Sequence, residues 1–161
     1  MNLVEIIRVT SDQDYKEAAR LIREYADRLN FDLSFQNFED EMNSLPIMYN
    51  ERDGGLFLAH LYQQPAGVVG LRRFNDADGE IKRMFVREQA RGNGIGEMLL
   101  KKCIETARAL NYATVKLDTT DTMQSAIKLY LDAGFMEIEP YRYNPEKGAR
   151  YFELSLKHGG A

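Results

Sequence analysis

Three glycines at alternate positions, Gly92, Gly94 and Gly96, constrain the fold of this 161-residue chain most strongly. They lie between a predicted strand and a predicted helix that begins near Ile95. Glycine lets the backbone approach a ligand closely and adopt conformations that other residues avoid. The start of a helix presents free N–H groups and the positive end of the helix dipole. The pattern therefore predicts a loop that binds a pyrophosphate, to which Arg91 adds a charge-assisted contact.

Two other phosphate-binding loops are excluded by their spacing. The Walker loop, G-x-x-x-x-G-K-[ST], requires a Lys-Ser or Lys-Thr pair, and none follows these glycines. The dinucleotide fingerprint G-x-G-x-x-G, counted from Gly92, would need a glycine where Glu97 stands. The glycines alone do not distinguish a pyrophosphate site from a turn that only joins a strand to a helix.

Hydrophobic periodicity and turn residues predict the other elements. The predicted helices cover residues 15–29, 36–44, 95–110 and 122–133, and the predicted strands cover 3–9, 55–61, 67–74, 80–86, 113–117, 135–139 and 151–156. A capping box from Ser11 to Asp14 precedes the first helix, Pro46 is expected to close the second, and Gly134 the last. Turns at 63–66 and 75–79 are short, so the strands they join should pair antiparallel. The order predicts one α+β domain over residues 1–161, built on a largely antiparallel sheet with one strand–helix–strand unit.

Composition excludes several classes of function. The net charge of −4 argues against a nucleic-acid partner. No apolar run reaches the ~20 residues of a membrane span, and the N-terminus does not resemble a signal peptide. The single cysteine, Cys103, permits no intrachain disulfide, and no Cys/His cluster has metal-binding spacing. We therefore expect a cytoplasmic protein without a metal.

Two blocks of sequence resemble the GNAT superfamily of N-acyltransferases. The first is the strand 81–86 followed by Arg91-Gly92-Asn93-Gly94-Ile95-Gly96, and the second is 126–135, which is similar to A-x-x-L-Y-x-x-x-G-F. The resemblance implies a three-layer fold, with a mixed, mostly antiparallel sheet of about seven strands flanked by about four helices. It also implies acetyl-CoA as the co-substrate.

The resemblance further implies how acetyl-CoA is held. The backbone of Phe85 and Val86 would pair with the pantetheine arm, and the N–H groups of 91–96 would hold the pyrophosphate. The thioester would lie where the strands 80–86 and 113–117 splay apart, near a polarising N–H at Phe85. Ser125 and Lys128 would approach the lower half of the co-substrate. Many relatives carry Asn where this chain has Met123, so that pantetheine contact is not expected here.

Two residues are candidates for proton transfer. Glu80 is the predicted base that deprotonates the amine, directly or through water; the alternative is an exposed acid or a salt bridge to Lys82 or Arg83. Tyr130 is the predicted acid that protonates the leaving thiolate, and its alternative is a core tyrosine. No Ser/His/Asp set is visible, and Cys103 lies on the apolar half of its helix, so direct attack in a ternary complex is expected rather than an acyl-enzyme.

The acceptor is expected to be a primary amine of a small molecule or a peptide. Tyr25 and Phe31 could form an aromatic wall or belong to the core, and Tyr141 and Asn144 could face the acceptor or belong to an ordinary strand connection. The competing hypothesis is a non-catalytic acyl-CoA-binding or regulatory module on the same fold. A homodimer is compatible with the resemblance, because dimers are common in this fold.

Overall fold

A computed structural model describes residues 3–29 and 37–156. Within these residues the chain forms one seven-stranded sheet, in the order β1-β2-β3-β4-β5-β7-β6. The strands are β1 (Val4–Arg8), β2 (Gly55–Leu61), β3 (Gln64–Arg73), β4 (Asp78–Val86), β5 (Thr114–Thr120), β6 (Met136–Ile138) and β7 (Ala149–Ser155). The helices are α1 (Asp12–Leu29), α2 (Phe38–Met42), α3 (Leu45–Met48), α4 (Ile95–Ala109) and α5 (Gln124–Asp132), with a 3₁₀ turn, η2 (Glu88–Ala90). The predicted α+β class is confirmed.

The sheet is antiparallel except at its centre. β4 and β5 pair in parallel, and α4 joins them, so the predicted strand–helix–strand unit is present. The two strands pair only from Asp78 to Glu80 on β4 and from Thr114 to Lys116 on β5. Both continue beyond these pairs, β4 to Val86 and β5 to Thr120. The sheet therefore divides where β4 and β5 diverge.

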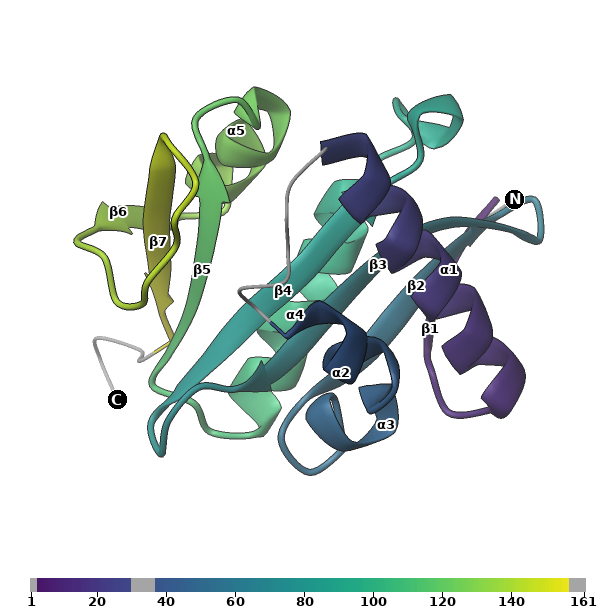
Figure 1. The fold of residues 1–161 in the computed structure, drawn as a ribbon, viewed down its shortest axis with the longest axis horizontal. Helices are drawn as coiled ribbons and strands as arrows, with labels where there is room; N and C mark the ends of the chain where they lie inside the picture. The colour runs from purple at the N-terminus through teal and green to yellow at the C-terminus, as the bar shows by residue number, and fades with distance from the viewer. Residues whose placement is uncertain (1–2, 30–36, 157–161) are drawn as a thin grey trace.

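Helices cover both faces of the sheet and make three layers (Figure 1). α1, α2 and α3 lie on one face, where the buried stripe Ala18, Leu21 and Ile22 of α1 packs on β2 and β3. α4 lies on the opposite face, and its buried residues include Leu99 and Cys103. Burying each large aliphatic side chain contributes about 1.5–3 kcal/mol. The two apolar helix faces that the periodicity predicted therefore hold the two halves of the core.

Three boundaries differ from the sequence predictions. The turn between β2 and β3 consists of Tyr62 and Gln63, with φ of +50° and +68°, so β3 begins at Gln64 rather than at residue 67. Two successive positive φ values suit the twist of a tight hairpin. Pro46 does not close a helix but lies in the first turn of α3, where a missing N–H costs little. β4 begins at Asp78, which places Glu80 inside the strand.

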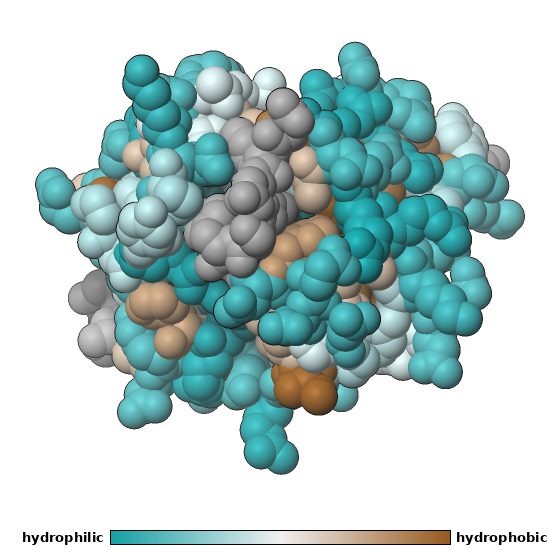
Figure 2. All heavy atoms as spheres, viewed as in Figure 1, coloured by the Kyte–Doolittle hydropathy of each residue, from teal (hydrophilic) through white to brown (hydrophobic). Residues whose placement is uncertain are grey.

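The face of the molecule seen in Figure 2 is mostly hydrophilic, with apolar residues showing in small separate groups. Among the described residues, the large apolar side chains that are exposed belong to Leu3, Ile47, Tyr62, Leu131, Met136 and Tyr143. Within residues 3–29 and 37–156, no helix is long and apolar enough to cross a membrane.

Candidate active site

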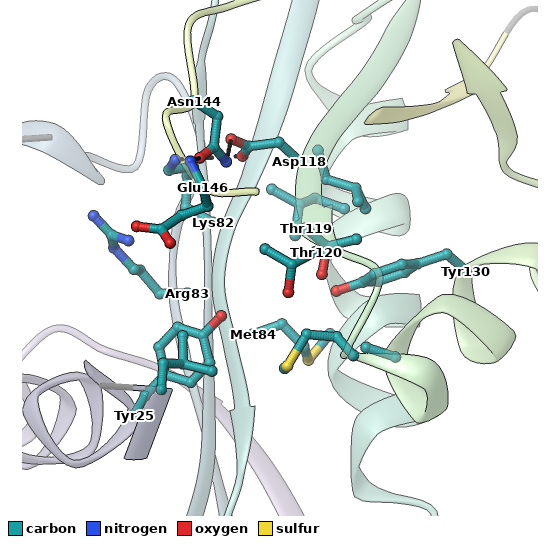
Figure 3. Close-up of a pocket in the computed structure, with 15 residues that line it drawn as sticks. Tyr25, Lys82, Arg83, Met84, Asp118, Thr119, Thr120, Tyr130, Asn144 and Glu146 are labelled. Carbon is teal, nitrogen blue, oxygen red and sulfur yellow. Dashed lines mark hydrogen bonds and ion pairs between the residues drawn. The ribbon is translucent and has the colours of Figure 1, made fainter. Parts of the chain in front are cut away.

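A pocket lies where β4 and β5 diverge, and it collects polar side chains from five parts of the chain (Figure 3). Its lining consists of Tyr25 and Leu29 of α1, residues 81–84 of β4, residues 117–120 of β5, Met123, Ala126 and Tyr130 at α5, and Asn144 and Glu146 of the β6–β7 connection. Because the two strands no longer hydrogen-bond to each other there, their edges border the pocket. The strand divergence that the resemblance implied is thus present.

A β-bulge shapes the β4 side of the pocket. The pairing of β3 with β4 shifts register between Val68 and Gly70, and opposite this shift Arg83 has a φ of +62°. A non-glycine residue in this conformation is strained and needs support from its surroundings. Support comes from Glu41 of α2, which accepts hydrogen bonds from Arg83 Nε and Nη2, both at 2.9 Å. The short helix α2 therefore anchors the bulge beside the pocket.

The Arg83–Glu41 pair is buried but fully engaged. Burial alone would raise the pKa of Glu41, but the hydrogen bonds and charge of Arg83, with Tyr49, outweigh it and hold that pKa below its ordinary value. The Tyr49 hydroxyl donates to the same carboxylate at 3.0 Å. Burial alone would lower the pKa of Arg83, but the hydrogen bonds and charge of Glu41 raise it above its ordinary value. Both groups are charged at neutral pH and compensate each other.

Two tyrosine hydroxyls point into the pocket from opposite sides, Tyr130 from α5 and Tyr25 from α1 (Figure 3). The Tyr130 ring packs at 5.8 Å from Phe135 and 6.4 Å from Phe152, measured between ring centroids. Burial raises the pKa of both phenols, so both keep their protons at neutral pH. Tyr130 thus combines its two expected settings: the ring belongs to the core and the hydroxyl faces the pocket.

A carboxylate, an amide and an ammonium group meet at one end of the pocket. Asn144 donates a hydrogen bond to Asp118 Oδ2 at 3.0 Å, and Lys82 Nζ lies 3.7 Å from Asp118 Oδ1 (Figure 3). The side chains of Lys82 and Asp118 are 5% and 6% exposed. Burial lowers the pKa of Lys82. The sequence patterns did not predict a role for Asp118, although an acid on a strand whose neighbours Val115 and Leu117 are apolar is a signal that could have indicated one.

The glycine loop leads directly into α4. Gly92 and Gly94 have φ of +87° and +74°, and Gly94 is the N-cap of α4, whose start has no side-chain cap. A Cβ at either position would meet no other atom, so space is not the constraint. Glycine is favoured at both positions because the backbone has a positive φ there. At Gly96 the constraint is space, because a Cβ would lie 3.3 Å from the side chain of Leu129 of α5. The loop is exposed from Arg91 to Gly94, while Ile95 is buried.

The side chain of Asn93 fixes the glycine loop to the preceding turn. Asn93 donates from its amide to the carbonyl oxygen of Ala90 at 2.8 Å, which ties the loop to the 3₁₀ turn η2. Uncapped N–H groups and the helix dipole at the start of α4 are therefore presented together on the exposed side of the loop.

The end of β4 keeps one edge available. Phe85 and Val86 pair with Val68 and Gly67 of β3, and among the described residues β5 does not pair with them on the other side. The Phe85 side chain is buried and packs against Tyr25, with ring centroids 5.6 Å apart. The backbone of Phe85 and Val86 therefore has one edge unpaired on the side where β4 and β5 diverge.

Ser125 and Lys128 are exposed on α5, and neither lines the pocket. Lys128 Nζ forms an ion pair with Asp132 at 2.7 Å. Met123, which replaces the asparagine that the resemblance would place at this position, lines the pocket.

Glu80 lies outside the pocket lining and is completely buried. Its carboxylate pairs with Arg72 and Arg142, each with a nitrogen at 3.0 Å, and accepts a hydrogen bond from Tyr141 at 2.7 Å. These partners differ from Lys82 and Arg83, the alternatives expected from the sequence. This environment favours a structural anchor over the proton-accepting role that the position of Glu80 predicted. It also turns the Tyr141 hydroxyl toward Glu80, whereas Asn144 faces the pocket.

Phe31 lies outside the described residues. Cys103 is buried, and burial raises the pKa of its thiol, which agrees with a structural role. Across the described ranges no group of His, Cys, Asp or Glu side chains could hold a metal ion.

Comparisons with known proteins agree with this architecture. A sequence profile of the Acetyltransferase (GNAT) family matches residues 18–135. An uncharacterised N-acetyltransferase of Schizosaccharomyces pombe is 33% identical, and the match covers 95% of both chains. The chain therefore belongs to the GNAT acetyltransferase family. Acetyl-CoA-dependent N-acetyltransferase is the class of enzyme that this membership defines.

Solved structures show the same fold. A GNAT-family acetyltransferase of Staphylococcus aureus superimposes with a TM-score of 0.79 at 27% identity, covering 96% of this chain and 99% of the other. A GNAT-family acetyltransferase of Elizabethkingia anophelis with acetyl-CoA bound gives a TM-score of 0.66 at 20% identity, with the same coverage of both chains.

Proposed function

We propose that this enzyme transfers an acetyl group from acetyl-CoA to a primary amine of a small molecule or peptide, by direct attack in a ternary complex. The observation that carries the proposal is the polar pocket at the divergence of β4 and β5. The glycine loop lies close to two elements that border this pocket: a Cβ at Gly96 would lie 3.3 Å from Leu129 of α5 and 3.9 Å from Val86 of β4. A phosphate-binding loop and a pocket with proton-donating and proton-accepting groups are thereby brought together.

The loop and strand edge suit an extended, phosphate-bearing thioester. Residues 91–96 would hold the pyrophosphate with backbone N–H groups, aided by the Arg91 side chain, because the start of α4 has no side-chain cap. The backbone of Phe85 and Val86 would pair with the pantetheine arm along the edge of β4 that β5 leaves unpaired. Ser125 and Lys128, on exposed α5, are candidates for the lower half of the co-substrate. Acetyl-CoA supplies the activated acyl group, and a relative of the same fold binds it.

Within the pocket we assign the acceptor end to Asp118 and Asn144. An alkylammonium group of pKa ~10 must lose a proton before its nitrogen can attack the thioester. A carboxylate can pair with the incoming ammonium group and take that proton, directly or through water. Asp118 faces the pocket and Glu80 does not, so Asp118 is the better-placed proton acceptor. Tyr25 borders the same space.

Tyr130 is assigned the opposite proton transfer. The amine nitrogen bonds to the acyl carbon as the carbon–sulfur bond breaks, and the Tyr130 hydroxyl gives its proton to the departing sulfur. Its raised pKa keeps that proton in place until the negative charge develops. The nitrogen loses its second proton as the amide forms and a proton returns to the Tyr130 oxygen, so the acetylated amine and free CoA are the products.

Ligand binding and turnover test this proposal separately. In thermal-shift measurements, acetyl-CoA and CoA should stabilise the protein and ATP should not; a larger effect of ATP would contradict the assignment. Thiol release should then occur with at least one member of a panel of small amines, diamines, amino acids and peptides. Stabilisation by CoA without release on any amine would instead support a non-catalytic acyl-CoA-binding module.

The Asp118→Asn variant tests the assigned proton acceptor. Loss of a general base typically slows a reaction by about 10²–10⁴-fold, so kcat should fall within that range. Asp76→Asn, at an exposed position in the β3–β4 turn, is the matched control and should retain wild-type turnover. Equal rates for the two variants would remove Asp118 from the mechanism.

A further inference from the structure

The connection between β6 and β7, residues 139–148, completes one end of the pocket. Two of its residues, Asn144 and Glu146, line the pocket, and Asn144 holds Asp118 of β5. Asn144 Oδ1 also accepts a hydrogen bond from the backbone N–H of Glu146 at 2.9 Å. The placement of this loop therefore decides where its pocket-facing groups lie.

Two earlier residues of the same loop reach across to β4 instead. The Tyr141 hydroxyl donates to Glu80 Oε2 at 2.7 Å, and Arg142 Nη2 donates to Glu80 Oε1 at 3.3 Å. Arg142 Nε also lies 3.0 Å from Glu80 Oε2. Glu80 and Lys116 form the last pair between β4 and β5, so the loop is attached where the strands begin to separate.

Further contacts support this network: Arg72 of β3 binds Glu80, and two aromatic rings pack against Tyr141. Arg72 of β3 donates from Nε to Glu80 Oε1 at 3.1 Å, which gives the carboxylate a second cationic partner. The Tyr141 ring packs edge-on against Phe74 at 5.0 Å and against Tyr151 at 5.6 Å, between centroids. A completely buried carboxylate with two arginines is costly to disturb, because removing one partner leaves a buried charge uncompensated.

The same contacts make Glu80 a poor proton acceptor. Both carboxylate oxygens are already engaged by protein groups, through hydrogen bonds from Arg72, Arg142 and Tyr141. A general base must come within hydrogen-bonding distance of the amine, or one water molecule away, and Glu80 is buried outside the pocket lining. Its geometry suits the fixing of a loop.

We propose that Glu80 is a positioning residue: its buried network with Arg142 and Tyr141 holds residues 139–148 so that Asn144 and Glu146 shape the acceptor end of the pocket. The inference rests on the proposed function, because it concerns the same pocket. It assigns Glu80 to acceptor binding and leaves proton removal to a different group. Variants of Glu80, Arg142 and Tyr141 should then share one kinetic signature.

The kinetic test compares Glu80→Gln, Arg142→Gln and Tyr141→Phe. The first two should raise the acceptor KM by about 10-fold, as expected for lost charge-assisted hydrogen bonds, and Tyr141→Phe should raise it less because the ring packing remains. The KM for acetyl-CoA and the acidic limb of the kcat/KM pH profile should be retained. Glu137→Gln, on exposed β6, is the matched control and should have a wild-type acceptor KM.

The opposite pattern would overturn the inference. If Glu80→Gln lowers kcat by about 100-fold and abolishes the acidic limb while the other two variants behave like wild type, Glu80 is the base. If Glu80→Gln does not fold, Arg142→Gln and Tyr141→Phe decide: a raised acceptor KM supports the inference, and wild-type values in both contradict it.

A second readout does not depend on catalysis. Hydrogen–deuterium exchange of peptides within 139–148 should be faster in the Arg142→Gln and Tyr141→Phe variants than in wild type or Glu137→Gln. Unchanged exchange there would refute the anchoring role, even for an enzyme whose acceptor is unknown. Absence of thiol release by the wild type with every amine would instead count against the proposed function.

Discussion

The buried Arg83–Glu41 pair offers the sharpest test of how the β4 bulge is maintained. Glu41→Gln keeps the size of the side chain but removes its charge, which leaves the Arg83 guanidinium uncompensated at 5% exposure. The change disturbs two hydrogen bonds from Arg83 at 2.9 Å and one from Tyr49 at 3.0 Å. Removing one partner of a buried ion pair costs about 3–5 kcal/mol of folding free energy. We expect about 3 kcal/mol here, because the amide oxygen of the glutamine can still accept a hydrogen bond.

For a domain of this length, 1 kcal/mol corresponds to about 2–4 °C in Tm, so we expect a decrease of roughly 6–12 °C. Urea unfolding would give the free energy directly. Glu39→Gln is a close control, because Glu39 lies on the same helix and is paired with Arg23 by two hydrogen bonds of 3.1 Å in an exposed position. Solvent screening makes such a pair weak, so this variant should resemble wild type. Equal losses in the two variants would refute the anchoring role of Glu41.

Three further predictions concern the pocket, the loop and acid stability. Tyr130→Phe should slow turnover by about 10²–10⁴-fold with little change in CoA affinity, measured by thiol release and thermal shift, and unchanged turnover would remove Tyr130 from the mechanism. Gly94→Ala places a side chain at a φ of +74°, so it should cost about 1–2 kcal/mol and reduce the thermal shift produced by acetyl-CoA; an undiminished shift would exclude the loop as the pyrophosphate site. The pKa of Glu41 in the folded state lies below its ordinary value of 4.5. Its contribution to stability is thus present above pH ~4.5 and is lost as the pH falls through the folded pKa. Urea unfolding between pH 3 and 6 should show a shallower acid decline for Glu41→Gln than for wild type, and equal slopes would contradict this.

Much of the fold could be predicted because its signals are local. The Ser11 cap is one example: its hydroxyl accepts the N–H of Asp14 at 3.1 Å, as the capping box predicted. The helix faces follow from apolar spacing, and Gly134, with φ of +100°, ends α5 as expected. The turn at Tyr62 and Gln63 was misplaced because these residues lack the usual turn chemistry, and β-sheet pairing imposes their positive φ values.

The site was only partly predictable because its central contacts join distant parts of the chain. Glu41 and Arg83 are 42 positions apart, and Glu80 and Arg142 are 62 apart. No periodicity reports such pairs, so Glu80 looked like a free acid near a strand start when it is the centre of a buried network. Asp118 was overlooked for the converse reason: its place beside the pocket depends on where β5 separates from β4.

A crystal structure with bound CoA would test the site most directly. The sulfur should lie in the pocket between β4 and β5, near the Tyr130 hydroxyl and on the side from which Asp118 can reach an incoming amine. The pyrophosphate should contact the backbone of 91–96 at the start of α4. A CoA molecule whose sulfur lies outside this pocket, or whose pyrophosphate binds away from the glycine loop, would contradict the proposed site.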